Sequence, residues 1–201
     1  MIMSKKSFNG ILIEKYIAMA NKERKYSETE NEKIRYSMRV LLSEIEKIGL
    51  ICIIMFIQNR LMMFICSFLV VFSIKQFLGG THRRTFLGCL LFSLFFFQIV
   101  VELAMRIDFK YMPCVLVGYG CLIYFKAPLQ YGQIKVYGKR EKQKCKVGSI
   151  LCIGSWFILI LAIPNNCFRQ TVSWTLCLQL IEILRVEGGR VICFIKNGCL
   201  N

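Results

Sequence analysis

The chain has little of what metal proteins and secreted proteins usually carry. Its 201 residues include one histidine, three prolines and 12 acidic residues against 27 basic ones. None of the 11 cysteines forms a Cys-x-x-Cys pair, so we expect no metal site and no cofactor. Apolar and polar residues do not alternate over any long stretch, which argues against a β-barrel. Residues 1–47 are polar and lack a small-residue cleavage site, which argues against a signal peptide.

Apolar residues are what the chain has in excess. They make up 56% of it, whereas soluble domains contain about 45–50%, and the mean hydropathy is +0.52. Phenylalanine and leucine dominate the apolar runs, as in helices that face lipid. The composition predicts an all-α, polytopic membrane protein.

The formal net charge of +15 has two readings. A soluble protein with this charge would be a candidate for binding nucleic acid, which we do not expect here. In a membrane protein, basic loops stay on the cytoplasmic side and set the topology. A basic cytoplasmic face would also attract an acidic peptide or anionic lipid.

The apolar runs predict six transmembrane helices, since about 20 residues cross a bilayer. The triplet Gln58-Asn59-Arg60 interrupts the first long run, which is either one helix or a hairpin. Basic segments on both sides of this run favour the hairpin, because both belong in the cytoplasm. This choice also places residues 130–146, predicted as a basic loop, and both termini in the cytoplasm. The predicted spans are residues 38–57, 61–77, 86–105, 111–127, 147–163 and 171–184.

The chain divides into three parts by composition. Residues 1–33 form a cytoplasmic segment, either a surface helix around residues 11–20 or a partly disordered tail. Residues 34–187 form the transmembrane domain, and residues 188–201 a cytoplasmic tail.

The segment from Gly79 to Cys89 contains the residues best suited to chemistry, including the only histidine, His82. Two glycines indicate a turn, and Thr85 is suited to cap a helix that begins at Phe86 with Cys89 in its first turn. A helix N-terminus and neighbouring arginines favour a thiolate, the nucleophilic form of cysteine. Seven residues of helix would separate His82 from Cys89 by about 10 Å, so a catalytic pair requires a bend; an incidental pair is the alternative.

Three carboxylates within the predicted spans are candidates for a functional role. Glu44 and Glu46 lie at the cytoplasmic end of the first span, where either could orient His82 or simply be solvated. Glu102 lies inside an apolar run. It is either a functional residue or one that reaches the outer interface.

These features together resemble the accessory gene regulator B (AgrB) family of membrane peptidases. The resemblance covers roughly residues 30–185. It rests on a Gly-Gly-x-His-x6-Cys motif with a cation seven residues before the histidine, an Ala-Pro pair, a lysine-rich segment and a Leu-Gln-Leu-Ile-Glu segment. The residues concerned are Lys75, Gly79, Gly80, His82, Cys89, Ala127, Pro128 and Leu178–Glu182.

The resemblance implies a cysteine endopeptidase in the bacterial cell membrane, with its active site facing the cytoplasm. Such a protein removes the C-terminal part of a short quorum-sensing propeptide of the AgrD type and allows its cyclisation to a thiolactone or lactone. Cys89 would be the nucleophile and His82 the base, in a chain that could act as a homodimer. The candidate substrate-binding residues are Lys75, Gly79, Gly80, Arg83 and Arg84. The alternative is a non-enzymatic transporter or peptide export partner.

Overall fold

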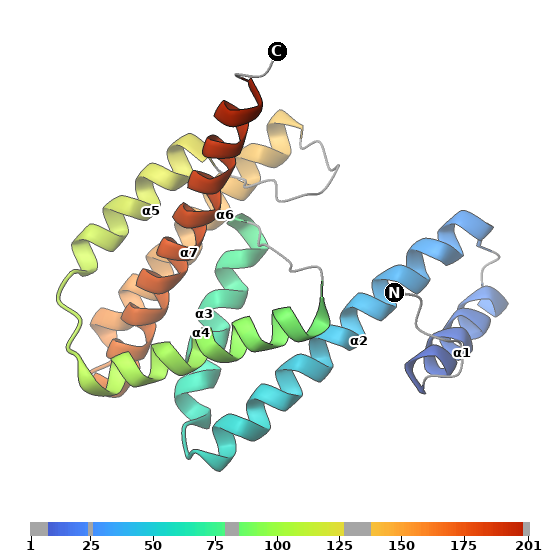
Figure 1. Ribbon diagram of the computed structural model, residues 1–201, viewed down its shortest axis with the longest axis horizontal. Helices are drawn as coiled ribbons and strands as arrows, with labels where there is room; N and C mark the ends of the chain where they lie inside the picture. Colours follow the sequence, from blue (N-terminus) through green and yellow to red (C-terminus); the bar gives the residue numbers. More distant parts are fainter. Residues whose placement is uncertain (1–7, 24–25, 79–84, 127–137, 199–201) are drawn as a thin grey trace. The chain divides into compact units, whose positions relative to one another are not determined.

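The computed structural model describes residues 8–23, 26–78, 85–126 and 138–198, and these ranges form α-helices α1 to α7 without a β-strand (Figure 1). The all-α prediction is therefore confirmed for this part of the chain. The chain divides into two compact units, one ending at Ile57 and the other beginning at Gln58. The boundaries predicted after residues 33 and 187 fall inside α2 and α7, both of which are continuous there.

The first unit contains α1 (Phe8–Glu23) and α2 (Glu28–Ile57). Ser27 starts α2 with a capping box, because its hydroxyl accepts from the Glu30 N–H at 3.3 Å while the Ser27 N–H donates to the Glu30 carboxylate at 2.9 Å. Arg35 of α2 donates to Glu14 of α1 at 2.9 Å, and this bond raises the pKa of Arg35. The predicted surface helix at residues 11–20 is thus a helix that packs on α2.

The break predicted at Gln58-Asn59-Arg60 is confirmed. α2 ends at Ile57, and α3 (Leu61–Leu78) begins after an interval of three residues. Asn59 has a φ of 56°, the left-handed conformation that asparagine tolerates better than most residues and that commonly ends a helix.

The second unit contains α3, α4 (Phe86–Arg106), α5 (Met112–Lys126), α6 (Lys139–Ala162) and α7 (Asn166–Gly198). α7 contacts all four other helices of this unit, and α3 packs on α4, α6 and α7 (Figure 1). α7 is therefore the helix around which the unit is assembled.

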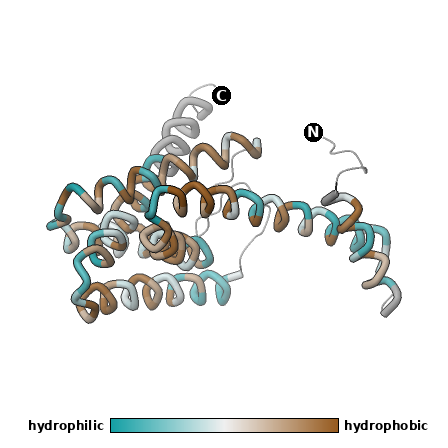
Figure 2. Tube along the Cα trace, turned by 90° about the horizontal axis from the view of Figure 1, so that it is seen from below, coloured by the Kyte–Doolittle hydropathy of each residue, from teal (hydrophilic) through white to brown (hydrophobic). Residues whose placement is uncertain are grey.

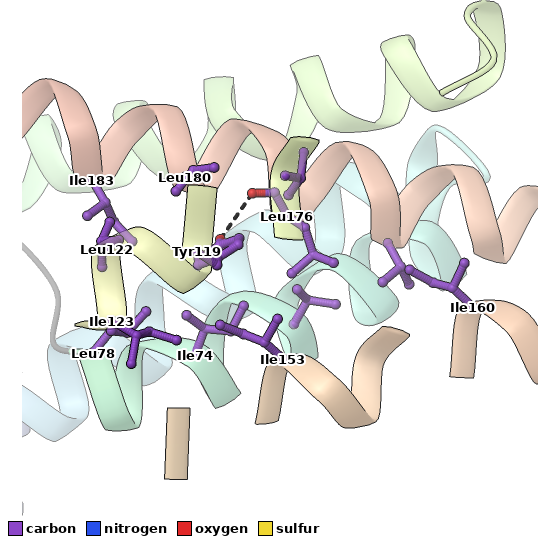
Figure 3. Close-up of a cluster of buried hydrophobic side chains, with 13 residues drawn as sticks. Ile74, Leu78, Tyr119, Leu122, Ile123, Ile153, Ile160, Leu176, Leu180 and Ile183 are labelled. Atoms are coloured by element: carbon purple, nitrogen blue, oxygen red, sulfur yellow. Dashed lines mark hydrogen bonds between the residues drawn. The ribbon is translucent and has the colours of Figure 1, made fainter. Parts of the chain in front are cut away.

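The core of this unit lies between α3, α5, α6 and α7 (Figure 3). Tyr119 of α5 is 1% exposed and donates its hydroxyl proton to the Leu176 carbonyl of α7 at 3.0 Å. The buried apolar side chains around it are Val70, Ile74, Leu78, Val115, Leu122, Ile123, Ile153, Ile160, Val172, Leu176, Leu180 and Ile183.

Polar side chains hold the connection between α4 and α5 against the start of α7. Gln170 accepts from the Phe109 N–H at 2.7 Å and donates to Asp108 at 3.1 Å. Trp174 donates its indole N–H to the Ile107 carbonyl at 2.9 Å. The bonds to Phe109 and Ile107 satisfy backbone groups of a non-helical segment, as an apolar environment requires.

The prediction of a basic loop over residues 130–146 is wrong for residues 139–146, which form the first two turns of α6. Lysine, arginine, glutamine and glutamate are good helix formers, and the Gly138 N–H donates to Glu141 at 3.2 Å at the helix start. Farther along, Lys146 donates to the Tyr124 carbonyl at 2.9 Å, in the last turn of α5. The basic segment therefore belongs to a helix that contacts α5.

Three helices, α3, α4 and α6, are long and apolar enough to cross a bilayer among the described residues, and α5 is a shorter apolar helix. Large apolar side chains on their surfaces face outward, for example Met62 (73% exposed), Phe95 (64%) and Leu151 (67%). Figure 2 shows long hydrophobic stretches separated by hydrophilic ones. Exposed apolar area of this extent indicates a membrane protein; the six spans and the cytoplasmic termini stay predictions.

Candidate active site

The start of α4 is built as the sequence predicts. Thr85 has extended backbone angles (φ −116°, ψ 144°), and its hydroxyl accepts from the Gly88 N–H at 3.2 Å. The Cys89 N–H donates to the Thr85 carbonyl at 3.1 Å and closes the first turn. Thr85 is thus the N-cap of a helix that begins at Phe86.

Cys89 is half-buried and lies on this first turn. Cα–Cβ bonds in a helix tilt toward its N-terminus, so the thiol is directed back toward the end that Thr85 caps. The partial positive charge at a helix N-terminus stabilises negative charge that develops beside it during a reaction. The position suits a nucleophile.

The backbone around Cys89 limits which N–H groups are available to a ligand. The first N–H groups of a helix have no carbonyl partner within it. The Thr85 hydroxyl accepts the N–H of Gly88, and the Thr85 carbonyl accepts that of Cys89 as the first bond of the helix. The N–H of Leu87, at the second position of the helix, likewise has no carbonyl partner within α4.

Lys75 is half-buried in the last turn of α3, where a cation is favourable next to the helix C-terminus. α3 ends at Leu78 and α4 begins at Phe86, so Lys75 and Cys89 lie close to the two ends of the segment that joins these helices. The other predicted residues of this segment lie outside the described residues: Gly79, Gly80, His82, Arg83 and Arg84. The geometry of the His82–Cys89 pair therefore stays a prediction.

The two candidate orienting carboxylates belong to α2, in the first unit. Glu44 forms an ion pair with Lys47, which is three residues later and 6% exposed. Glu46 is exposed. Glu44 thus neutralises a buried lysine, whatever further role it has.

A polar cluster at the far end of α4 is the part that sequence reasoning missed. Glu102 pairs with Arg60, from the turn before α3, and with Arg106 at 3.0 Å. Gln98, one turn before Glu102, donates to Gln58 at 2.8 Å. The signal was present in the sequence, because a carboxylate in an apolar run needs a partner, and the predicted hairpin puts Arg60 at the same end of the spans.

The fold and this site define a class: helical membrane proteins with a cysteine on the first turn of an apolar helix. The chain belongs to the accessory gene regulator B (AgrB) family, whose sequence profile matches residues 13–183. It is 25% identical, over 171 residues and 83% of each chain, to an AgrB-like protein of Clostridium beijerinckii. No solved structure matches it. This family processes autoinducer propeptides, and its substrates are of the AgrD type.

Proposed function

We propose that this protein is a membrane-embedded cysteine endopeptidase that cleaves an AgrD-type propeptide, with Cys89 as nucleophile and His82 as general base. The observation that carries the proposal is the position of Cys89 on the capped first turn of α4, seven residues after the only histidine of the chain. Family membership supplies the substrate class.

The first step transfers the N-terminal part of the propeptide to the enzyme. His82 takes the proton of the Cys89 thiol, the sulfur attacks the scissile carbonyl carbon, and a C–S bond forms. The C–N bond then breaks as His82 gives the proton to the leaving amine. The Leu87 N–H is a candidate oxyanion donor for this step, because a preorganised N–H stabilises the developing negative charge.

The second step releases the product as a ring. A thiol or hydroxyl of the bound propeptide attacks the thioester carbon, the C–S bond to Cys89 breaks, and the proton returns to the Cys89 sulfur. Exclusion of water by the bound propeptide would favour cyclisation over hydrolysis. Lys75, Arg83 and Arg84 are the cations that would attract an acidic C-terminal part of the propeptide.

The proposed topology has six spans, both termini in the cytoplasm and the active site at the cytoplasmic ends of α3 and α4. The lipid bilayer and a second copy of the chain are the remaining proposed partners.

Co-expression with a C-terminally tagged AgrD-type propeptide tests the proposal. Cys89→Ala and His82→Ala should leave the precursor intact on an immunoblot. The Cys145→Ala variant, which lacks another half-buried thiol, should cleave the precursor normally. Release of the tag by the Cys89→Ala variant would refute the proposal and favour a non-enzymatic role.

A propeptide whose ring-forming Cys or Ser is replaced by Ala tests the intermediate. This propeptide should be cleaved once, and its N-terminal part should remain attached to Cys89 as a thioester. The mass of the protein then increases by the mass of that part, and hydroxylamine reverses the increase. A normal mass after cleavage of the tag would argue against the thioester.

A further inference from the structure

The turn between α2 and α3 is bonded to one face of α4. Gln98 donates to the side-chain oxygen of Gln58 at 2.8 Å, and Arg60 donates to Glu102. Gln98 and Glu102 are four residues apart, so they lie one above the other on the helix. We call these four residues the polar clasp.

Only one of the two arginines at Glu102 joins different elements. Arg106 is on α4 itself, four residues after Glu102, and is 77% exposed. Arg60 precedes α3 and is 23% exposed, and Glu102 is 34% exposed. The more shielded of the two pairs is therefore the one that crosses from the turn to α4.

Next to the clasp, Phe64 of α3 packs edge-on against Phe97 of α4 with ring centroids 4.8 Å apart, and Phe64 is 1% exposed. α4 also packs on α7, and its buried residues beyond Phe97 are Val100, Val101 and Ala104. The hydrophobic effect is not directional, whereas hydrogen bonds and charged pairs are. The clasp therefore adds a directional restraint on the rotation of α4 to these apolar contacts.

Cys89 lies on the same helix, 13 residues before Glu102 and about 20 Å away along the axis. α4 is continuous between them, so a rotation at the clasp turns Cys89 by a similar angle. A misplacement of reacting atoms by about 1 Å can reduce a rate by about 100-fold.

We propose that the polar clasp sets the direction of the Cys89 thiol, and that Arg60 and Glu102 are positioning residues for propeptide cleavage. This inference rests on the proposed function. The clasp acts through α4 and touches neither substrate nor thiol.

The first test measures the thiol itself and needs no turnover. In purified protein, the rate of maleimide addition to Cys89 is measured by peptide mass spectrometry, with Cys145 of the same chain as internal reference. Arg60→Gln and Glu102→Gln should change the Cys89 rate about threefold or more and leave the Cys145 rate constant, since only α4 turns. Arg106→Gln is the matched control, because it removes an ion pair of Glu102 within α4, and it should change neither rate.

The second test separates positioning from a loss of fold. The clasp variants should lower kcat for propeptide cleavage about tenfold with KM unchanged, because binding is intact and alignment is not. Gln58→Ala replaces the Arg60 and Glu102 variants if these fail to fold. It removes one hydrogen bond of the turn and should lower kcat by less than the charge variants do. In an Arg106→Gln background, Arg60→Glu should be inactive, and adding Glu102→Arg should restore kcat.

Two results would overturn the inference: clasp variants whose Cys89 reactivity matches that of Arg106→Gln, or a charge reversal that gives no recovery. Neither result affects the proposed function as long as the Cys89→Ala variant does not cleave the propeptide. Conversely, a fully active Cys89→Ala variant would refute the proposed function, and the maleimide rates would still report whether the clasp directs the thiol.

Discussion

At the scale of single residues, Thr85 matters because it determines where α4 starts. Its hydroxyl and carbonyl accept the N–H groups of Gly88 and Cys89. Loss of an N-cap side chain typically costs about 1 kcal/mol, and here the turn at risk carries the proposed nucleophile.

We expect Thr85→Ala to lower the cleavage rate of a tagged propeptide several-fold, because the first turn of α4 frays and Cys89 loses its fixed direction. Thr85→Ser keeps the hydroxyl and should retain the rate. Equal rates in the alanine and serine variants, measured by immunoblot time courses, would show that the cap has no part in catalysis.

Gln179 of α7 is a second residue with a distinct position. Its side chain is 0% exposed, and neither polar atom of its amide has a hydrogen-bond partner among the residues that the structure describes. By contrast Thr175, one turn earlier, has its hydroxyl 2.9 Å from that of Ser67 on α3. An unsatisfied buried amide destabilises the folded state.

Gln179→Leu should therefore stabilise the protein by about 1 kcal/mol, or roughly 2–4 °C in Tm for a chain of this size. Gln170→Leu is the control, since this amide bonds Phe109 and Asp108, and it should lower Tm. Thermal unfolding in detergent provides the measurement, and a decrease in Tm for Gln179→Leu would mean that the amide has a partner in the protein as purified.

At the scale of elements, the contact between α3 and α6 depends on a glycine. A Cβ at Gly148 would lie 2.4 Å from the ring of Phe77, whereas one at Gly154, on the same helix, would meet nothing within 4 Å. Small residues of this kind let membrane helices approach closely.

We expect Gly148→Ala to lower Tm, because the ring of Phe77 or the helix must move. Gly154→Ala should leave Tm unchanged or raise it, since alanine is the better helix former by about 1 kcal/mol. Thermal unfolding of the two variants in the same detergent decides the point, and equal Tm values would mean that the α3–α6 contact adjusts without cost.

At the scale of the whole molecule, topology is the property on which the proposed mechanism depends. The prediction places the connection between α4 and α5 outside the cell and the start of α6 inside, because the basic segment around α6 should stay in the cytoplasm. Asp108, in the connection between α4 and α5, and Gly138, immediately before α6, are suitable positions for labelling.

In a cysteine-free background, Asp108→Cys should react with a membrane-impermeant maleimide in intact cells. Gly138→Cys should react only after permeabilisation. The reverse pattern would contradict the proposed topology and the cytoplasmic location of the active site.

Much of this protein follows from its sequence alone. The helical class, the membrane environment, the break at Asn59 and the start of α4 at Thr85 all depend on neighbouring residues, because run length, turn residues and caps act over a few positions. The helical turns at residues 139–146 depend equally on local propensity, which the charge pattern of this segment does not reveal.

Only the tertiary structure decided which distant side chains meet. The pairing of Glu102 with Arg60, 42 residues away, the isolation of the Gln179 amide and the contact of Gly148 with Phe77 depend on how helices pack. A hydrophobic pattern indicates which face of a helix avoids water, but that face can pack equally well against lipid or against another helix. In a membrane protein the partner of each face is therefore determined by close packing and by the few directional polar bonds between helices.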